Sequence, residues 1–289
     1  MCDDFTDPAT GVAAGPALSR RELGLLGAAA AVTACSGADA GAAGAILVEA
    51  MVTVKTSDGL ADAFFVHPAR GRYPGVVMWP DIAGLRDAKK AMARRLAEAG
   101  YAVLVVNQYY RNSPAPVLES FAQWRTPEGQ AKLKPMIAAI APEGTTRDAA
   151  AFVAWLDGQA AVDPGRGIGS NGYCMGGPFT VRTAFAAPER VRAAASFHGA
   201  ALVTDRPDSP HNLLASTKAR YLFAAGRNDD ERAPTDKDTL KAAAQAAGRP
   251  AEIEVYPADH GWTVPDSPVY DAAQAERAWG RLLALFAHL

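Results

Sequence analysis

Cysteine is scarce in this sequence. Among 289 residues there are only Cys2, Cys35 and Cys174, and the first two lie in an N-terminal segment that we expect to stand outside the folded domain. A single thiol inside the fold cannot form an intramolecular disulfide or a cysteine-rich metal site. Its presence therefore needs a packing or a chemical reason, and packing is the default until its neighbours are considered.

A net charge is lacking as well. The 29 lysines and arginines nearly balance the 31 aspartates and glutamates, for a formal charge of -2. No strong field therefore draws the chain to nucleic acid or to an anionic membrane surface, and we expect a small, largely neutral partner. No internal repeat is present, and a hydrophobic content of 49% suits one globular domain. The sequence leaves the oligomeric state open, with a monomer favoured.

Residues 1–44 form no part of the expected domain. The pair Arg20-Arg21 precedes an Ala-rich apolar stretch at 24–34, which is too short to serve as a stable transmembrane anchor. This order resembles a twin-arginine export signal, and the Val-Thr-Ala-Cys run that ends at Cys35 resembles a lipoprotein processing site. The resemblance implies an exported protein, periplasmic or anchored to the envelope through a lipid on Cys35, without a membrane-spanning domain. The alternative is a cytoplasmic protein with an Ala/Gly-rich tail.

Residues 45–289 alternate short β-branched and aromatic runs with longer segments of helical spacing. Such alternation is typical of βαβ units around a largely parallel sheet, so we expect one α/β domain with an eight-stranded sheet and helices on both faces. The expected strands are 51–56, 60–67, 75–79, 102–107, 167–173, 193–197, 220–225 and 252–256. The expected helices are 87–99, 146–159, 175–186, 235–247 and 268–288.

The segment 109–144 breaks this alternation. Prolines recur through it, around two short amphipathic pieces. Long connections in compact domains are more often functional than idle, so we interpret the segment as a cap insertion over the active site. An ordinary surface excursion is the alternative.

The strongest motif is Gly172-Tyr173-Cys174-Met175-Gly176, placed where an expected buried strand passes into a helix. It has the form of a nucleophile elbow, in which the nucleophile occupies a sharp turn and glycines two residues to either side leave room for neighbouring backbone. The N-terminus of the following helix favours a thiolate over a thiol. The motif therefore predicts Cys174 as a nucleophile.

A competing pattern overlaps this motif. Gly167, Gly169 and Gly172 also fit the G-x-G-x-x-G spacing of a dinucleotide site. That fingerprint belongs in the first βα turn, with an acid about 20 residues on at the end of the next strand. Here the glycines run into an expected strand, and the nearest acid, Glu189, precedes the next strand. We therefore favour the elbow.

A thiol nucleophile requires a base and an orienting acid, which in this arrangement follow it in the order acid then histidine. Asp229 and His260 each stand just past an expected strand. His260 would take the thiol proton, while Asp229 would fix the tautomer of its ring. Asp230 is the runner-up acid. Asp259 is a poorer choice, because adjacent side chains on a tight loop point apart.

The loop Trp-Pro-Asp-Ile-Ala-Gly-Leu-Arg at 79–86 follows another expected strand. In this arrangement such a loop supplies the second amide of an oxyanion hole. The backbone N–H groups of Met175 and Ile82 are therefore expected to hold the oxyanion.

The remaining histidines show no metal-ligand spacing, so we expect no metal site. His67, His211 and His288 are interpreted as structural groups. His198 follows an expected strand in Ser-Phe-His-Gly, and for this residue a place on the floor of a pocket is the alternative.

Four motifs together resemble the dienelactone hydrolase family over nearly all of residues 51–289. The resemblance implies an α/β-hydrolase with a Cys-His-Asp triad, which cleaves lactones or small esters without a metal or organic cofactor. It also implies that the acid before the oxyanion-loop isoleucine contacts the resting thiol; Asp81 stands there, where the founding enzymes have the longer Glu. The motifs are Gly-Tyr-Cys-Met-Gly-Gly at 172–177, Pro-Asp-Ile-Ala-Gly-Leu at 80–85, Gly-Arg-Asn-Asp at 226–229 and Asp-His-Gly-Trp at 259–262.

Members of this family that cleave dienelactones hold the substrate carboxylate with arginines, one of them four residues past the catalytic histidine. Val264 stands at that position here, so carboxylate recognition loses a partner. Arg111 is another source of positive charge, and Tyr109, Tyr110 and Trp262 are expected to wall the pocket. A less polar ester is therefore as well supported as an anionic lactone.

The sequence thus predicts a hydrolase that acts on a small ester or lactone. The alternative is a non-hydrolytic small-molecule binder or a redox-sensing thiol protein on the same fold, because a cysteine of low pKa is open to oxidation. The lack of a second cysteine in the domain counts against a reversible sensor.

Overall fold

The structure is a computed structural model that describes residues 46–289. The expected export signal and the lipidation site at Cys35 lie outside these residues. Within them, no helix has both the length and the apolar character needed to cross a membrane.

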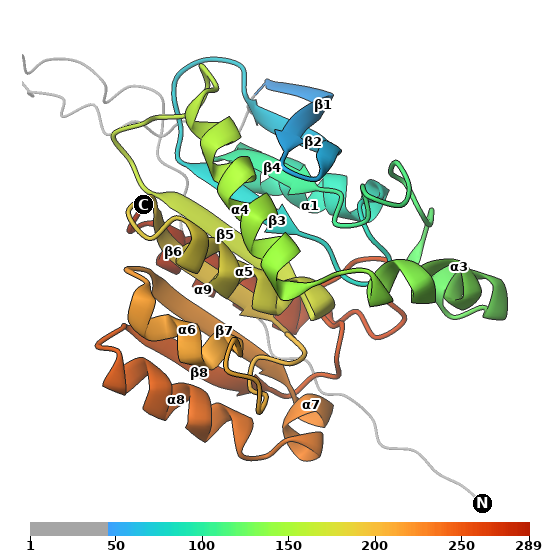
Figure 1. Cartoon of the computed structure of the whole chain (residues 1–289), viewed down its shortest axis with the longest axis vertical. Coiled ribbons are helices and arrows are strands. Elements are labelled where there is room, and N and C mark those ends of the chain that lie inside the picture. The colour runs from blue at the N-terminus through green and yellow to red at the C-terminus, as the bar shows by residue number, and fades with distance from the viewer. Residues whose placement is uncertain (1–45) are drawn as a thin grey trace, which may run out of the picture. The chain divides into compact units, whose positions relative to one another are not determined.

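An eight-stranded sheet forms the centre of the described chain, in the order β1-β2-β4-β3-β5-β6-β7-β8 (Figure 1). β2 pairs antiparallel with both β1 and β4, and the other neighbours are parallel. All eight expected strands are present, and the mostly parallel sheet is as predicted. Their bounds are β1 Leu47–Thr56, β2 Gly59–Pro68, β3 Gly75–Trp79, β4 Ala102–Val106, β5 Ile168–Tyr173, β6 Val191–Phe197, β7 Arg220–Gly226 and β8 Ala251–Tyr256.

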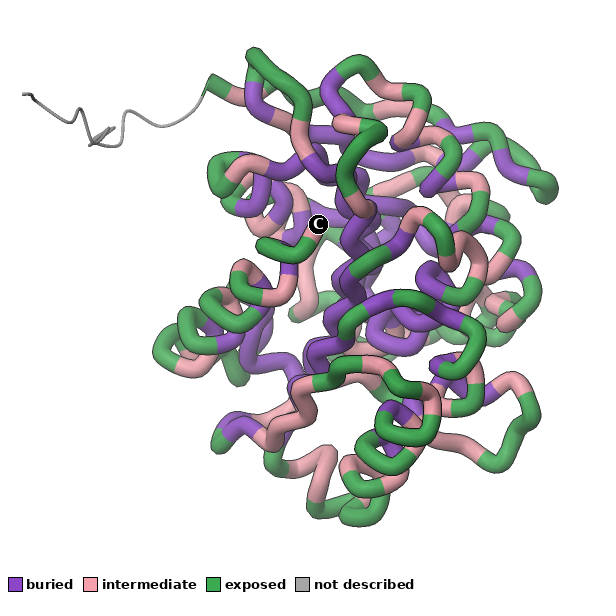
Figure 2. Tube along the Cα trace, turned by 90° about the vertical axis from the view of Figure 1, so that its left-hand side faces the viewer, coloured by how far each residue is buried: buried purple, intermediate pink, exposed green. Residues whose placement is uncertain are grey.

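Helices cover both faces of the sheet, and a band of buried residues runs between them (Figure 2). Successive strand residues turn to opposite faces. Val77 therefore packs in one core cluster with α4, α5 and α8, whereas Val76 packs in a second with α1 and α9. The helices are α1 Asp87–Glu98, α2 Phe121–Trp124, α3 Pro127–Ala138, α4 Pro142–Asp157, α5 Gly177–Ala186, α6 Pro210–Leu213, α7 Arg227–Arg232, α8 Asp236–Ala246 and α9 Ala272–Phe286.

Two helices begin four residues away from the position expected from the sequence. α4 begins at Pro142 rather than at residue 146, because proline at the first helical position has the required φ and lacks only a hydrogen that would stay unpaired. α9 begins at Ala272 rather than at residue 268, because the Asp271 side chain caps it by accepting the N–H of Gln274.

Residues 109–144 contain α2, α3 and the start of α4, and α3 reaches out beyond the sheet in Figure 1. Leu133 of α3 is fully buried in a third apolar cluster with Tyr109 and Leu118. Met175, the residue after the predicted nucleophile, packs against this cluster. The segment therefore contacts the turn at which the predicted active site is expected.

Candidate active site

β5 ends in a sharp turn at Cys174. This residue has a φ of 53°, in the left-handed region that non-glycine residues rarely adopt, and a short 3-10 turn, Cys174–Gly176, leads into α5. A Cβ on Gly172 would lie 2.1 Å from the carbonyl oxygen of Gly176, and one on Gly176 would lie 2.5 Å from that of Pro80. Both positions therefore require glycine, and the turn packs directly against the loop that follows β3.

His260 and Asp229 meet beyond the ends of β8 and β7. Nδ1 of His260 lies 2.9 Å from both carboxylate oxygens of Asp229, and the backbone N–H of His260 donates to Asn228 Oδ1 at 2.8 Å. Burial acts to lower the pKa of His260, but hydrogen bonds with Asp229 and Cys174 outweigh burial and raise this pKa to about 10. The structure thus joins Asp229 and His260 by a hydrogen bond, and Cys174 is close enough to help raise the pKa of the His260 ring.

The two neighbouring acids face elsewhere. Both oxygens of Asp230 lie 2.7 Å from the Nζ of a lysine in α8, and Asp259 accepts a hydrogen bond from Arg227 at 2.7 Å. Arg232, which the sequence analysis did not single out, lies one turn after Asp229 in α7 and donates to its Oδ1 at 2.5 Å. A second donor therefore helps to fix the carboxylate that faces His260.

The amides expected to form an oxyanion hole come from adjoining segments. Among the backbone–backbone bonds of loops and turns in residues 46–289, the N–H of Ile82 has no acceptor, and Met175 lies in the 3-10 turn that leads into α5. Tyr109 Oη donates to the carbonyl of Ile82 at 2.7 Å, and Gln108 Nε2 donates to the carbonyl of Asp81 at 2.7 Å. Two side chains that follow β4 thus hold the loop that carries the Ile82 amide.

Asp81 corrects an expectation, because in the described chain its carboxylate bonds to cations rather than to the thiol. It lies 2.8 Å from Arg86 Nη1 and 2.9 Å from Lys89 Nζ, and it accepts the N–H of Ala83. Burial acts to raise the pKa of Asp81, but the charges of Lys89 and Arg86 hold it well below its usual range. The aspartate is one methylene shorter than glutamate, and two buried cations close to it in sequence capture it.

Arg86 joins three segments that are distant in sequence. Its guanidinium bonds to Asp81 and also to Asp266, at 2.7 Å, in the loop after His260. Asp266 Oδ2 in turn accepts the N–H of Phe121, the first residue of α2. The Arg86 side chain has no exposed surface. One buried guanidinium therefore links the oxyanion loop, the histidine loop and the segment 109–144.

His198 lies beneath the residues that meet at the elbow. It follows β6 and is 1% exposed. Its ring centroid is 4.8 Å from that of His260, and its Nδ1 accepts the N–H of Cys174 at 3.1 Å. Burial, and then the charge of His260, hold the pKa of His198 well below its usual range, so its ring is neutral.

Tyr109 and Trp262 were both expected to wall the pocket, and the structure places them differently. Tyr109 is buried beside the elbow, with its hydroxyl 4.0 Å from the sulfur of Met175. Trp262 has no exposed surface; it stacks on Tyr256 at 5.1 Å between ring centroids and meets His198 edge to face at 5.2 Å. Trp262 therefore supports the floor from within the core, which corrects the expectation that it walls the pocket.

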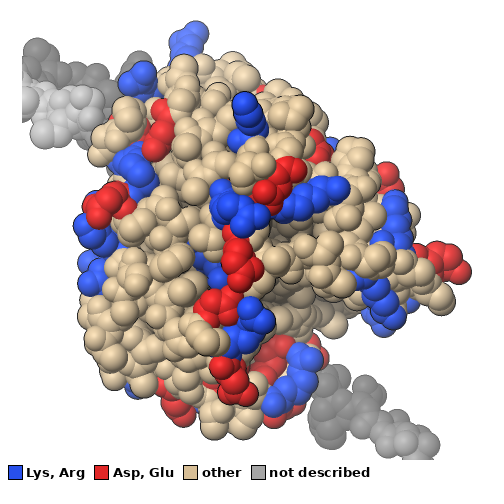
Figure 3. All heavy atoms as spheres, viewed as in Figure 1, with Lys and Arg blue, Asp and Glu red and all other residues tan. Residues whose placement is uncertain are grey.

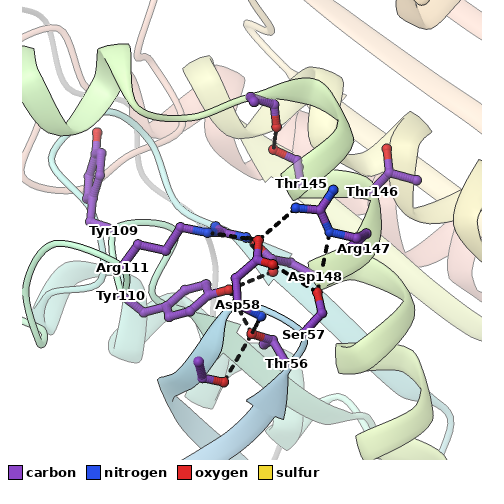
Figure 4. A network of polar contacts seen from close by, with 12 residues as sticks. Thr56, Ser57, Asp58, Tyr109, Tyr110, Arg111, Thr145, Thr146, Arg147 and Asp148 are labelled. Carbon is purple, nitrogen blue, oxygen red and sulfur yellow. Dashed lines mark hydrogen bonds and ion pairs between the residues drawn. The ribbon is translucent and has the colours of Figure 1, made fainter.

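Tyr110 and Arg111 also depart from expectation. Figure 4 shows both side chains pointing into a polar network, while Tyr109 points away from it. Arg111 pairs with Asp58 at 2.6 Å and with Asp148 at 2.8 Å, and the hydroxyl of Tyr110 donates to Asp148 at 2.8 Å. Carboxylates from the β1–β2 turn and from α4 thus hold these two residues. The positive charge of Arg111, which was expected to face the substrate, is paired with these carboxylates instead.

The chain is similar to known proteins over most of the described residues. The model of the dienelactone hydrolase family matches residues 61–289. A protein of Methylorubrum extorquens assigned as a carboxymethylenebutenolidase is 29% identical over 242 residues, which cover 82% of this chain and 79% of its own. A protein of Escherichia coli K12 with the same assignment is 26% identical over 247 residues, which cover 83% of this chain and 87% of its own.

A solved structure assigned as a dienelactone hydrolase from Klebsiella pneumoniae is similar in fold. It aligns with a TM-score of 0.73 at 23% identity and covers 84% of this chain and 100% of its own. Since the family model matches most of the chain, and the sheet and its elbow have the architecture of these enzymes, the chain belongs to the dienelactone hydrolase family of α/β-hydrolases.

Proposed function

We propose that this hydrolase cleaves ester or lactone bonds with Cys174 as nucleophile, His260 as proton carrier and Asp229 as orienting acid. The observation that carries the proposal is the pairing of Asp229 with Nδ1 of His260, beside a glycine-flanked turn at which Cys174 has a φ of 53°. Asp229 occupies Nδ1 of His260, which leaves Nε2 for the sulfur and the leaving group.

In the proposed acylation step, Nε2 of His260 takes the proton of the Cys174 thiol, which the raised pKa of His260 favours. The sulfur of Cys174 attacks the carbonyl carbon, and the amides of Met175 and Ile82 hold the oxyanion. The intermediate collapses to a thioester as the C–O bond breaks, and His260 gives its proton to the leaving alcohol.

Deacylation uses the same histidine in the opposite sense. Thioester formation removes the charge of Cys174, one of the two groups that raise the pKa of His260, so the neutral ring becomes available as a base. His260 accepts a proton from water as the water oxygen attacks the thioester. The C–S bond then breaks, the acid leaves, and the pair of Cys174 thiolate and protonated His260 is restored.

The surroundings of the elbow favour an uncharged, apolar ester or lactone. Met175 packs against an apolar cluster that includes Val117, Leu118 and Leu133 from the segment 109–144. Arg86, which follows the oxyanion loop, and Arg111, which follows Tyr110, each bond to two carboxylates of the protein. A substrate carboxylate would have to compete with these partners, whereas a neutral acyl group would not.

Turnover of short-chain p-nitrophenyl esters and small lactones tests the proposal. Cys174→Ala should lower kcat/KM by about a thousand-fold or more, because the covalent path is lost. Asp229→Asn should lower it by about 10²–10⁴, whereas the matched control Asp230→Asn should stay close to the wild type. Undiminished turnover in a folded Cys174→Ala variant would end the proposal, and a larger loss in Asp230→Asn than in Asp229→Asn would reassign the acid.

A further inference from the structure

The backbone of the nucleophile is held on both sides by the segment that follows β6. The N–H of Cys174 donates to Nδ1 of His198 at 3.1 Å, and the carbonyl of Cys174 accepts the N–H of Ala200 at 3.2 Å. Cys174 and His198 both have positive φ, 53° and 41°, as does Ala201 at 56°. Left-handed conformations at non-glycine residues cost about 1–3 kcal/mol each and persist only where neighbouring contacts impose them.

The contacts of His198 fix which of its nitrogens carries the proton. A backbone N–H can only donate, so Nδ1 must be bare where it faces Cys174. The hydrogen of the neutral ring is therefore on Nε2, which lies 3.0 Å from Thr263 Oγ1. Thr263 follows His260 by three residues, so the neutral ring of His198 connects the loop of the base to the turn of the nucleophile.

We propose that His198 is a positioning residue for the hydrolysis, which holds the Cys174 backbone in its left-handed conformation through Nδ1 and is itself aligned by Thr263 through Nε2. The ring has little freedom to do otherwise, because it is 1% exposed and Trp262 packs edge to face against it at 5.2 Å. This inference rests on the proposed nucleophile. It adds a residue that acts through the backbone of the nucleophile.

Two amide variants separate the two nitrogens. Asn places its oxygen near the position of ring Nδ1, whereas Gln places its amide near that of Nε2. His198→Asn should therefore keep the acceptor for the Cys174 N–H, while His198→Gln should keep the contact with Thr263 and leave that N–H unpaired. His198→Phe keeps the aromatic packing and loses both contacts.

Two readouts are measured on the full chain: kcat and KM for a neutral ester, and the rate at which iodoacetamide alkylates Cys174 across pH, followed by mass spectrometry of the peptide that contains it. His198→Gln and His198→Phe should lower kcat and slow alkylation by about tenfold with little change in KM, which corresponds to one lost hydrogen bond to a buried donor. His198→Asn should recover most of both. A purely structural histidine would instead lower the melting temperature in all three and leave kcat per folded molecule unchanged.

Equal behaviour of the Asn and Gln variants, or better activity with Gln, would overturn the proposal. If these variants fail to fold, Thr263→Val tests the role of His198 in their place. Loss of the Thr263 acceptor favours the tautomer with hydrogen on Nδ1, which cannot accept from Cys174, so kcat and alkylation should both fall about fivefold. Unchanged values would refute the role. Alkylation does not require turnover, so failure of the hydrolase assignment would show in Cys174→Ala and leave this test readable.

Discussion

At the scale of the residue, the proposed mechanism makes the protonation of His260 depend on neighbours that change during the reaction. Asp229 is bonded to Nδ1 in the structure, whereas in the proposed cycle the charge of Cys174 is present only before acylation and after deacylation. The same ring can therefore hold a proton firmly in one half of the cycle and accept one in the other. A histidine with a fixed pKa of about 10 could do only the first.

Asp229→Asn should move the alkaline limb of the acylation pH profile to lower pH. Hydrogen bonding to Asp229 opposes the effect of burial and helps to raise the pKa of His260 to about 10, so without the carboxylate burial should lower that pKa. A raised pKa keeps the ring protonated to higher pH, and only the protonated ring can supply a proton to the leaving alcohol. Single-turnover release of the alcohol from an alkyl ester, whose leaving group needs this proton, measures the limb as a function of pH.

Asp230→Asn is the control for this shift, since Asp230 bonds to Lys237 instead of to the histidine. Its alkaline limb should coincide with that of the wild type. An unmoved limb in Asp229→Asn, with the fold intact, would show that another group sets the protonation of His260.

The site residues that could be predicted are those identified by the order of the motifs along the chain and by the local geometry of the turn. Gly172 and Gly176 flank Cys174 because no Cβ fits there, so the sequence pattern itself predicts the turn. The sequence does not predict the direction in which a long side chain points. Arg111 was expected to face the substrate, but its partners Asp58 and Asp148 lie 53 and 37 positions away. Pairings over such distances depend on the completed fold.

The position of Lys89 in the sequence also predicts a buried ion pair. It shares the inward face of α1 with Ala93, Leu96 and Ala97, at helical spacing. A lysine on an apolar face must be paired when buried, and here Asp81 is its partner. Burial lowers the pKa of Lys89 to about 8 even though Asp81 opposes this.

At the scale of the element, Arg86 ties two loops and the start of α2 together, so its removal should be felt as lost stability. Arg86→Met leaves Asp81 and Asp266 without a common partner, and breaking a buried pair on one side costs about 3–5 kcal/mol. We expect the free energy of unfolding in urea to fall by that amount. The exposed pair Arg281–Glu252 provides the control, and Arg281→Met should cost less than about 1 kcal/mol. Similar losses in both variants would contradict the assigned importance of burial.

Strands were easier to predict than helix ends. The β-branched runs of β3 and β4 are buried on both faces, and their length and composition suffice to identify them. Helix starts depend on single caps such as Pro142 and Asp271, which apolar spacing does not reveal. The short helix α7 was not among the expected helices, because its six residues, five of them charged, show no apolar face.

At the scale of the whole molecule, the alternation of strand and helix was enough to predict a largely parallel eight-stranded sheet with helices on both faces. The antiparallel pairing of β2 with β4 was not predicted, since neither strand carries a mark of its direction. Substrate choice is also beyond the sequence, because it depends on how the segment 109–144 packs over Met175 and on which charges remain unpaired.

The charges beside the elbow balance: buried Asp81 and half-buried Asp266 face the buried Arg86 and Lys89. On the outside, acidic and basic side chains are interleaved over the face shown in Figure 3. Diffusing esters should therefore meet no long-range attraction, and kcat/KM should stay nearly constant as potassium chloride screens the surface. Stopped-flow rates for a neutral and an anionic ester at rising ionic strength measure this. A steep decline for the anion alone would reveal steering by a cation at the entrance.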